Sequence, residues 1–283
     1  ELDMSNEPVI NLLANWLETS GFKVTKQRVN SGKYNLISTI GHGSDGLIFS
    51  GHTDTVPYDE ALWQSDPFKL TEREGRYFGL GSCDMKSFIA MAIIASQKFD
   101  PEKFIHPLTI VATADEETTM SGARLLAENG KNLGQFCVIG EPTNLTPVRE
   151  HKGIIMESIR FSGLSGHSSD PSLGNSALEA MHEFIQQLLV YRTQLQQKFK
   201  NTAFDVSTPT LNLGHIHGGD NPNRICGECE LHIDLRFLPG MSIEELRDQV
   251  RSLAKKVASS REQRVSFTPL LMGIPAMQTA SDS

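Results

Sequence analysis

Short apolar runs in the first half of the chain are each followed by a histidine or a carboxylate. If these runs are neighbouring strands of an open α/β sheet, their carboxyl ends meet in one crevice and the side chains converge there. Imidazole nitrogen and carboxylate oxygen are both ligands of zinc in proteins. The pattern therefore predicts a metal site. The runs and the residues that follow them are 47–50 with His52 and Asp54, 108–112 with Asp115, Glu116 and Glu117, and 136–139 with Glu141.

Two pairs of residues in this set suggest a division of roles. Asp54 follows His52 by two positions, so in a continuing strand both side chains point to one side, and the carboxylate can hold the imidazole in its metal-binding tautomer. Of the adjacent acids Glu116 and Glu117, one can bind metal while the other takes a proton from water. Two acids in a row are common by chance, so this pair carries weight only together with the other segments.

Asp84 is a fourth candidate ligand. It lies between a glycine-rich turn (Gly79, Gly81) and a helix expected to begin near Met85, where backbone amides and the helix dipole favour an anion. The alternative is a simple N-cap.

The expected elements indicate an α/β fold followed by a second arrangement. Apolar spacing predicts a helix over 7–20 and another over 85–99, alternating with strands that include 35–40. From residue 153 the expected order is that of a ferredoxin-like β-α-β-β-α-β unit. Its strands are 154–161, 208–216, 225–237 and 265–271, and its helices are 176–198 and 243–259, the latter opening with the capping box of Ser242 and Glu245.

The composition of the chain limits the kinds of partner that it is expected to bind. The 283 residues carry 34 acidic and 26 basic side chains, a formal net charge of -8, which disfavours nucleic acid and anionic membranes and favours a small-molecule ligand. The sequence shows neither a membrane-length apolar run nor a secretory signal, and its four cysteines suit a reducing compartment, so a cytoplasmic protein is expected.

Four motifs resemble the co-catalytic zinc deacylases and exopeptidases: GHTDTVP at 51–57, GSCDMK at 81–86, ADEET at 114–118 and IGEPT at 139–143. The similarity covers essentially the whole chain. The stretch at 223–240, with EHKG at 150–153, is most similar to members that act on acetylornithine. The resemblance implies hydrolysis of N2-acetyl-L-ornithine, with succinyl-diaminopimelate, another N-acyl amino acid or a dipeptide as alternative substrates.

The resemblance also implies roles for single residues. Asp84 would bridge two zinc ions, His52 and Glu117 would each complete one or other zinc, and Glu141 would bind the second, with Co²⁺ or Mn²⁺ as possible substitutes. Glu116 would be the general base that takes a proton from water and returns it to the departing amine, and Asp54 would orient His52.

A three-layer catalytic domain with an inserted lid is the architecture that the resemblance implies. Residues 1–152 would begin the catalytic domain, residues 153–272 would form a ferredoxin-like lid that also dimerises, and residues 273–283 would begin the returning catalytic segment. His167 would stabilise the developing oxyanion, in some members across the dimer. The polar positions matching those that hold the substrate's carboxylate are Arg236, Asn221 and Asn223.

One departure from the family pattern concerns its last zinc ligand, a histidine near the end of the catalytic domain. The last histidine here is His232, and the sequence ends at Ser283. On this basis we expect a fragment that lacks full activity and binds its second metal weakly or not at all.

Other interpretations were weighed. The CxxC spacing of Cys226 and Cys229 could indicate a zinc knuckle or a redox pair, but the alternation over 229–237 favours a half-buried strand, in which residues three apart face opposite sides unless Gly227 forms a bulge. His215 and His217 favour one face of a solvated strand over a second metal site. A non-catalytic binding protein on the same fold is the rival from another class, opposed by the presence of both Glu116 and Glu117. A nucleic-acid-binding role for the ferredoxin-like unit is opposed by the charge balance.

Overall fold

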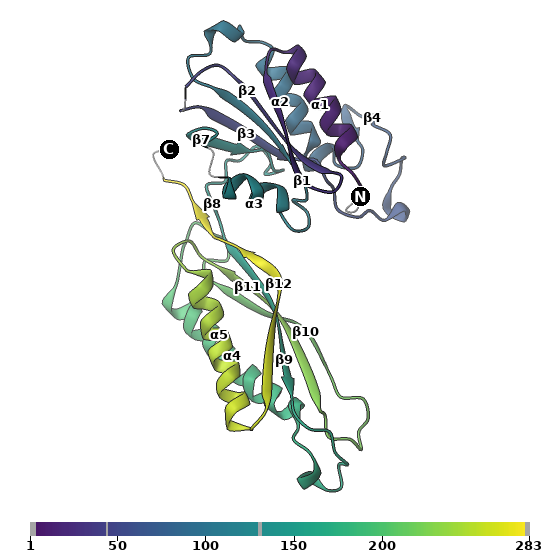
Figure 1. The fold of residues 1–283 in the computed structure, drawn as a ribbon, viewed down its shortest axis with the longest axis vertical. Helices are drawn as coiled ribbons and strands as arrows, with labels where there is room; N and C mark the ends of the chain where they lie inside the picture. The colour runs from purple at the N-terminus through teal and green to yellow at the C-terminus, as the bar shows by residue number, and fades with distance from the viewer. Residues whose placement is uncertain (1–3, 44, 130–131, 281–283) are drawn as a thin grey trace. The chain divides into compact units, whose positions relative to one another are not determined.

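The computed structural model describes residues 4–43, 45–129 and 132–280. The chain divides into two compact units, residues 1–146 and residues 147–283, each with its own hydrophobic core (Figure 1).

A five-stranded mixed sheet forms the centre of the first unit, in the order β1-β2-β6-β3-β7. The antiparallel part joins β1, β2 and β6, whereas β6, β3 and β7 run parallel. The strands are β1 (Lys23–Asn30), β2 (Lys33–Ile40), β3 (Leu47–His52), β6 (Leu108–Thr113) and β7 (Phe136–Ile139). The three parallel strands are those whose carboxyl ends carry the candidate ligands, so the expected convergence has its structural basis here.

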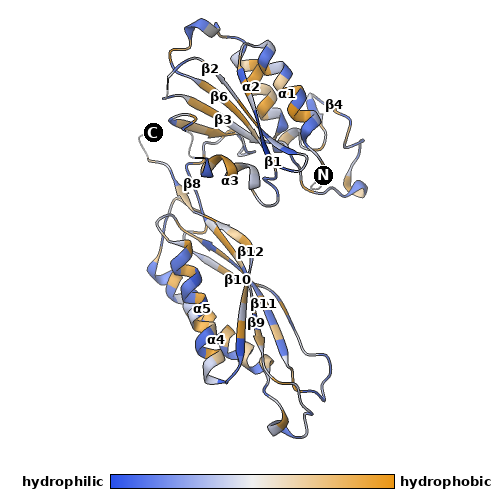
Figure 2. Cartoon of the chain, in the orientation of Figure 1, coloured by the Kyte–Doolittle hydropathy of each residue, from blue (hydrophilic) through white to orange (hydrophobic). Residues whose placement is uncertain are grey.

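Helices cover both faces of this sheet. α1 (Glu7–Thr19) and α2 (Ser87–Ser96) pack on one face, where Leu36 of β2 is buried in the core. The preceding side chain, Asn35, points to the opposite face and donates to the carbonyl of Gly122 (2.9 Å) in α3 (Ser121–Glu128). Most of α2 is apolar in Figure 2. Among the described residues, no helix combines the length and apolar character needed to cross a membrane.

The segment before α2 differs from the expectation. The helix begins at Ser87 rather than near Met85, and Ser82–Lys86 forms a π-type turn in which Asp84 has non-helical angles (φ -118°, ψ 96°) and a cis peptide bond to Met85. Asp84 is therefore neither an N-cap nor at the helix terminus, and its side chain is free to turn toward the strand ends. The shorter elements of the first unit are η1 (Glu60–Leu62), β4 (Thr71–Arg73), β5 (Arg76–Phe78) and η3 (Pro101–Lys103).

The second unit has the expected β-α-β-β-α-β order. Its antiparallel sheet has the order β10-β11-β9-β12, and two helices pack on one face. The elements are β9 (Gly153–Ser162), α4 (Ala177–Lys198), β10 (Thr210–Gly218), β11 (Glu228–Phe237), α5 (Ile243–Ser260) and β12 (Arg264–Ile274), with β8 (Glu150–His151), η4 (Pro171–Leu173) and β13 (Met277–Gln278) beside them. The predicted cap is confirmed: the Ser242 hydroxyl accepts from the amide of Glu245 (3.3 Å).

Both cysteines of the CxxC sequence are buried, but only Cys229 belongs to a strand. β11 begins at Glu228 rather than at residue 225 and pairs with β9 without a register shift, so Cys226 precedes the strand and no bulge is present in this pairing. Burial, reinforced by Cys226, raises the pKa of Cys229 to about 11. A thiol held protonated is a poor metal ligand and a poor nucleophile, which favours the packing interpretation.

His215 and His217 of β10 pair in regular order with β11, so they lie on one face of the sheet, as the sequence predicted. A register shift between Leu213 and His215 separates the two pairings of this strand. His215 pairs with His232 of β11, their rings 4.6 Å apart between centroids, and His217 pairs with Glu230.

Candidate metal centre

His52 ends β3 at the middle of the parallel strands, where it is 1% exposed. Its Nδ1 lies 3.1 Å from the backbone carbonyl of Asp54 and 3.5 Å from an Asp54 carboxylate oxygen. Its Nε2 lies 2.9 Å from the carboxylate of Asp84. A histidine that donates through Nδ1 presents Nε2 as its metal-binding nitrogen.

Among the residues that the structure describes, two groups of side chains could each hold a metal ion, and both groups include His52. In one group it is joined by Asp84 and Glu141, and in the other by Glu116 and Glu117; the ligand atoms within each group lie within 4.8 Å of one another. Among the described residues, the structure thus brings together the four expected ligands His52, Asp84, Glu117 and Glu141 with Glu116, whereas Asp115 belongs to neither group. Asp84 comes from the turn before α2, and Glu141 from the end of β7.

Two carboxylates hold the loop that carries Glu116 and Glu117. Asp54 accepts hydrogen bonds from the backbone amides of both glutamates, at 3.2 and 3.0 Å. Asp54 therefore contacts both the histidine and the loop, a second role that the sequence did not predict.

Asp115 supports the same loop from its other side. Its backbone has φ +58°, a conformation that is uncommon outside glycine, and its side chain forms an ion pair with Lys33 (3.1 Å). Its second oxygen accepts from Ser121 (2.8 Å) and from Asn30 (3.3 Å). These contacts tie the loop to β2, β1 and α3, so its conformation is fixed before any ligand binds.

The site has an excess of negative charge over positive. Burial would lower the pKa of His52, but its interactions with Asp54 and Asp84 outweigh burial and raise that pKa to about 9. Burial, added to the negative charge of neighbouring carboxylates, raises the pKa of each of three glutamates. These are Glu116, Glu117 and Glu141. A bound cation would relieve this repulsion, so the electrostatics fit a metal site.

Lys86 is a cation of this region that the sequence reading did not single out. Burial lowers its pKa, and the charges of Asp54 and Asp84 partly offset that effect. A side-chain carbon at Gly81, where φ is +73°, would overlap the ammonium group of Lys86. The GSCDMK motif contains both residues, which was the available signal.

The donor set of one imidazole and several carboxylates fits zinc and is compatible with cobalt or manganese. The two groups contain five different residues, one histidine and four acids, and two of the acids, Glu116 and Glu117, are adjacent in the chain.

Three of the four candidate residues in the second unit lie on two loops that contact each other, and the fourth lies elsewhere. His167 pairs with Arg224 in an isolated bridge, and the amide of Ser168 donates to the carbonyl of Asn223 (3.0 Å). The side chain of Asn221 accepts from the amide of Asn223 (3.2 Å). Thus His167, Asn221 and Asn223 share one pair of loops.

Arg236 lies apart from that loop pair, on β11. Its guanidinium binds both oxygens of Asp234 at 2.8 and 3.0 Å. A carboxylate ligand would have to share or displace Asp234.

Comparison with known proteins identifies the family. Residues 48–279 match the description Peptidase family M20/M25/M40. The chain belongs to this family. An acetylornithine deacetylase of Proteus mirabilis is 49% identical over 282 residues, which cover 99% of this chain and 73% of the relative. One of Vibrio atlanticus is 47% identical over 280 residues, covering 99% and 74%.

Two solved peptidase structures have a fold similar to that of this chain. Aminopeptidase PepT of Bacillus cereus matches with a TM-score of 0.72 at 17% identity, over 100% of this chain and 75% of the other. An M20 family metallo-carboxypeptidase of Sulfolobus solfataricus matches with a TM-score of 0.71 at 15% identity, over 98% and 75%. At these identities the likeness establishes the α/β architecture and not the substrate.

Proposed function

We propose that the chain hydrolyses the amide bond of N2-acetyl-L-ornithine and releases L-ornithine and acetate. The observation that carries this proposal is 47–49% identity to acetylornithine deacetylases along 99% of the chain. The residues grouped around His52 are an imidazole and carboxylates, the kinds of group that bind zinc in proteins, which supports a metal-dependent amidohydrolase of this family. The substrate class is therefore a small N-acyl amino acid.

Zinc is the proposed metal, with two ions per complete subunit. His52, Asp84, Glu117 and Glu141 would hold them, and the resemblance to the family is what suggests that Asp84 would serve both ions. When bound, zinc supplies Lewis acidity that polarises the amide carbonyl and makes water more acidic.

Glu116 is the proposed general base. Its amide is anchored to Asp54, and the raised pKa of its side chain suits a group that must accept a proton and later release it. In this scheme Glu116 takes a proton from the attacking water and delivers it to the departing amine. Asp54 orients His52 and fixes the position of the loop.

The second unit is proposed to complete the site. Residues 153–272 would act as a lid and dimerisation domain, while residues 1–152 and 273–283 would belong to the catalytic domain. His167 would stabilise the oxyanion, and the substrate's carboxylate would bind at Arg236, Asn221 and Asn223. The loop of His167 is hydrogen-bonded to the loop that carries Asn221 and Asn223, which supports a shared role for these three residues. The proposed active form is a homodimer, and its proposed location is the cytoplasm.

Zinc titration tests the metal site. Calorimetry of the purified chain against His52→Ala should show a saturable site that is lost in the variant, because the imidazole is common to both groups. A conservative control is Glu18→Gln, an exposed position on α1. Equal zinc binding by His52→Ala would remove the basis of the proposed metal centre.

The reaction itself is tested by ornithine release from N2-acetyl-L-ornithine by zinc-loaded protein. Glu116→Gln should lower kcat by roughly 10²- to 10⁴-fold and leave zinc binding intact, since general-base catalysis contributes about that factor. Preference for succinyl-diaminopimelate would support the alternative within the family. Ligand binding without hydrolysis of any acyl amino acid would support the non-catalytic alternative.

A further inference from the structure

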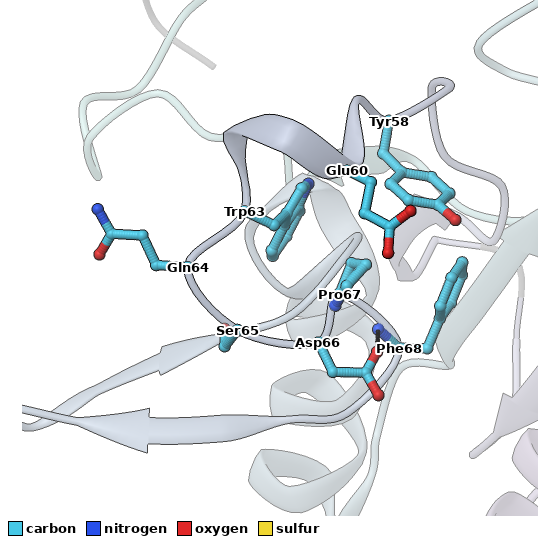
Figure 3. A pocket seen from close by; sticks show the side chains of 8 residues that line it. All are labelled: Tyr58, Glu60, Trp63, Gln64, Ser65, Asp66, Pro67 and Phe68. Atoms are coloured by element: carbon cyan, nitrogen blue, oxygen red, sulfur yellow. Dashed lines mark hydrogen bonds between the residues drawn. The ribbon is translucent and has the colours of Figure 1, made fainter.

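Two segments next to the quoted motifs lie outside the metal-ligand groups: the loop that follows GHTDTVP, and the EHKG sequence at 150–153. The loop encloses a cavity of about 410 Å³, and every residue that lines it lies between Tyr58 and Phe68, so the cavity is a local structure (Figure 3). The EHKG residues instead contact a segment 51 to 56 positions further along the chain, close to the point where the chain enters the second unit.

Lys152 attaches the loop between α4 and β10. Its ammonium group donates to the backbone carbonyls of Val206 and Thr208, both at 2.7 Å. It also lies over the ring of Phe204, 5.6 Å from the ring centroid. Burial lowers the pKa of this lysine. Hydrogen bonds from a charged donor are roughly twice as strong as neutral ones, so two of them on one loop make a firm attachment.

Glu150 makes a second attachment to the same loop. Its carboxylate accepts from the side-chain amide of Asn201 (2.7 Å). Asn201 also closes the loop on itself, because its backbone amide donates to the carbonyl of Ser207 (2.8 Å) and its side-chain oxygen accepts from the amide of Ala203 (2.9 Å). Residues 199–209, which we call the clamp loop, are therefore fixed to the EHKG segment at two points.

The strand that the clamp loop holds is too short to support itself. β8 and β13 have two residues each and pair with one another, His151 with Met277 and Glu150 with Gln278. A two-stranded ribbon of this length has little stability of its own in water. Its direction therefore depends on support from its sides, and the contacts of Glu150 and Lys152 supply that support.

The segment before this ribbon is held by little packing. The first unit ends at residue 146. Just before that point, Asn144 and Leu145 both have positive φ (56° and 58°), and the side chain of Leu145 is fully exposed. Two units joined by such a segment are expected to move relative to one another unless the connection is held. The clamped ribbon is the first structure that the chain forms after the boundary.

We propose that Lys152 and Glu150 are positioning residues. They hold the start of the second unit rigid and thereby fix the direction in which that unit presents its substrate-binding side chains to the metal centre. The inference rests on the proposed function, in which both units contribute to one site. Neither residue touches the reacting atoms in this scheme; each acts through the clamp loop and the ribbon.

Lys152→Met tests the clamp, because methionine keeps the apolar length of the side chain but loses both hydrogen bonds. We expect kcat/KM for N2-acetyl-L-ornithine to fall roughly 10- to 100-fold, since a misplacement of about 1 Å can cost 10²-fold in rate. Zinc affinity should be unchanged, because the candidate ligands belong to residues 52–141. Lys152→Arg should restore most of the activity, and Glu150→Ala, which removes one contact, should cause a smaller loss. Lys200→Met, at an exposed position of the clamp loop, is the matched control.

A distance measurement decides the inference without using activity. Spin labels on non-natural amino acids at the exposed positions Glu18 and Gln186 place one probe in each unit. Double electron–electron resonance on folded protein should give a broader distance distribution for Lys152→Met than for the wild type, Lys152→Arg and Lys200→Met. An unchanged distribution would overturn the proposal. A broader distribution with unchanged kcat/KM would refute the positioning role. If the wild type hydrolyses no acyl amino acid, the proposed function fails, and the distances still show whether the clamp holds the second unit.

Discussion

The ion pair of Lys33 and Asp115 allows a quantitative test of how the Glu116–Glu117 loop is held. Their side chains are 9% and 10% exposed, so the Lys33→Met variant leaves a nearly buried carboxylate without its cation. Removing one partner of a buried ion pair costs about 3–5 kcal/mol. Because Ser121 and Asn30 still donate to Asp115, we expect the lower end of that range, about 3 kcal/mol.

Urea unfolding followed by tryptophan fluorescence measures this loss in the relevant unit, since Trp16 and Trp63 both belong to residues 1–146. Lys23→Met, at an exposed position of β1, is the control for removal of a lysine. Asp115→Asn preserves a residue that tolerates positive φ, so the double variant should recover part of the stability lost in Lys33→Met.

A functional readout separates positioning from simple stability. If the pair fixes the loop, zinc affinity of the folded Lys33→Met protein should fall about 10- to 100-fold, as is typical when a group supporting a metal ligand is removed. Lys33→Arg should restore much of it. An unfolding midpoint equal to that of the wild type, or strictly additive effects of the two substitutions, would refute the reasoning.

Three further substitutions test other contacts. Asp54→Asn loses an acceptor for the loop amides, so zinc affinity should fall about 10- to 100-fold in a chelator competition, and unchanged affinity would contradict its positioning role. Hydrogen bonds, led by that from Ser158, lower the pKa of Glu230 from 4.5 to about 2. This carboxylate therefore stabilises the second unit above pH 4.5, and the contribution is lost as pH falls through 2. Melting curves should show Glu230→Gln destabilised by about 1 kcal/mol at pH 7, after allowance for screening, with the difference from wild type disappearing as the pH falls below the folded-state pKa. A methyl group in Gly153→Ala would overlap the ring of Phe237, so we expect a loss of about 1–3 kcal/mol in chemical denaturation; no loss would show that the ring moves freely.

Features set by local patterns were predictable from sequence. The parallel strands β3, β6 and β7 are apolar runs with polar residues directly after them, and their convergence follows from the strand-end rule. The capping box at Ser242 is likewise a short-range signal. The convergence of His52, Glu116 and Glu141 needed only that these strands be neighbours.

Features that depend on long-range contacts were missed. β1 is an edge strand with little burial and only two apolar residues, Val24 and Val29, so its sequence gives almost no alternating pattern. The pairing of Lys33 with Asp115 joins residues far apart in the chain, and nothing in either neighbourhood indicates it. The sequence predicted that Asp84 lies between a glycine-rich turn and a helix, but it did not indicate that this helix begins only at Ser87 or that the backbone of Asp84 has non-helical angles.

The two ligand groups share a single imidazole, and Nδ1 of that ring already faces Asp54. Only Nε2 of His52 is left to coordinate, and it can enter the coordination sphere of one ion. Among the described residues the two ions would therefore be chemically unequal, one bound by nitrogen and oxygen and the other by oxygen alone. We expect stepwise loading, with a one-metal species that can be isolated and whose visible spectrum, with cobalt as the probe, differs from that of the fully loaded protein.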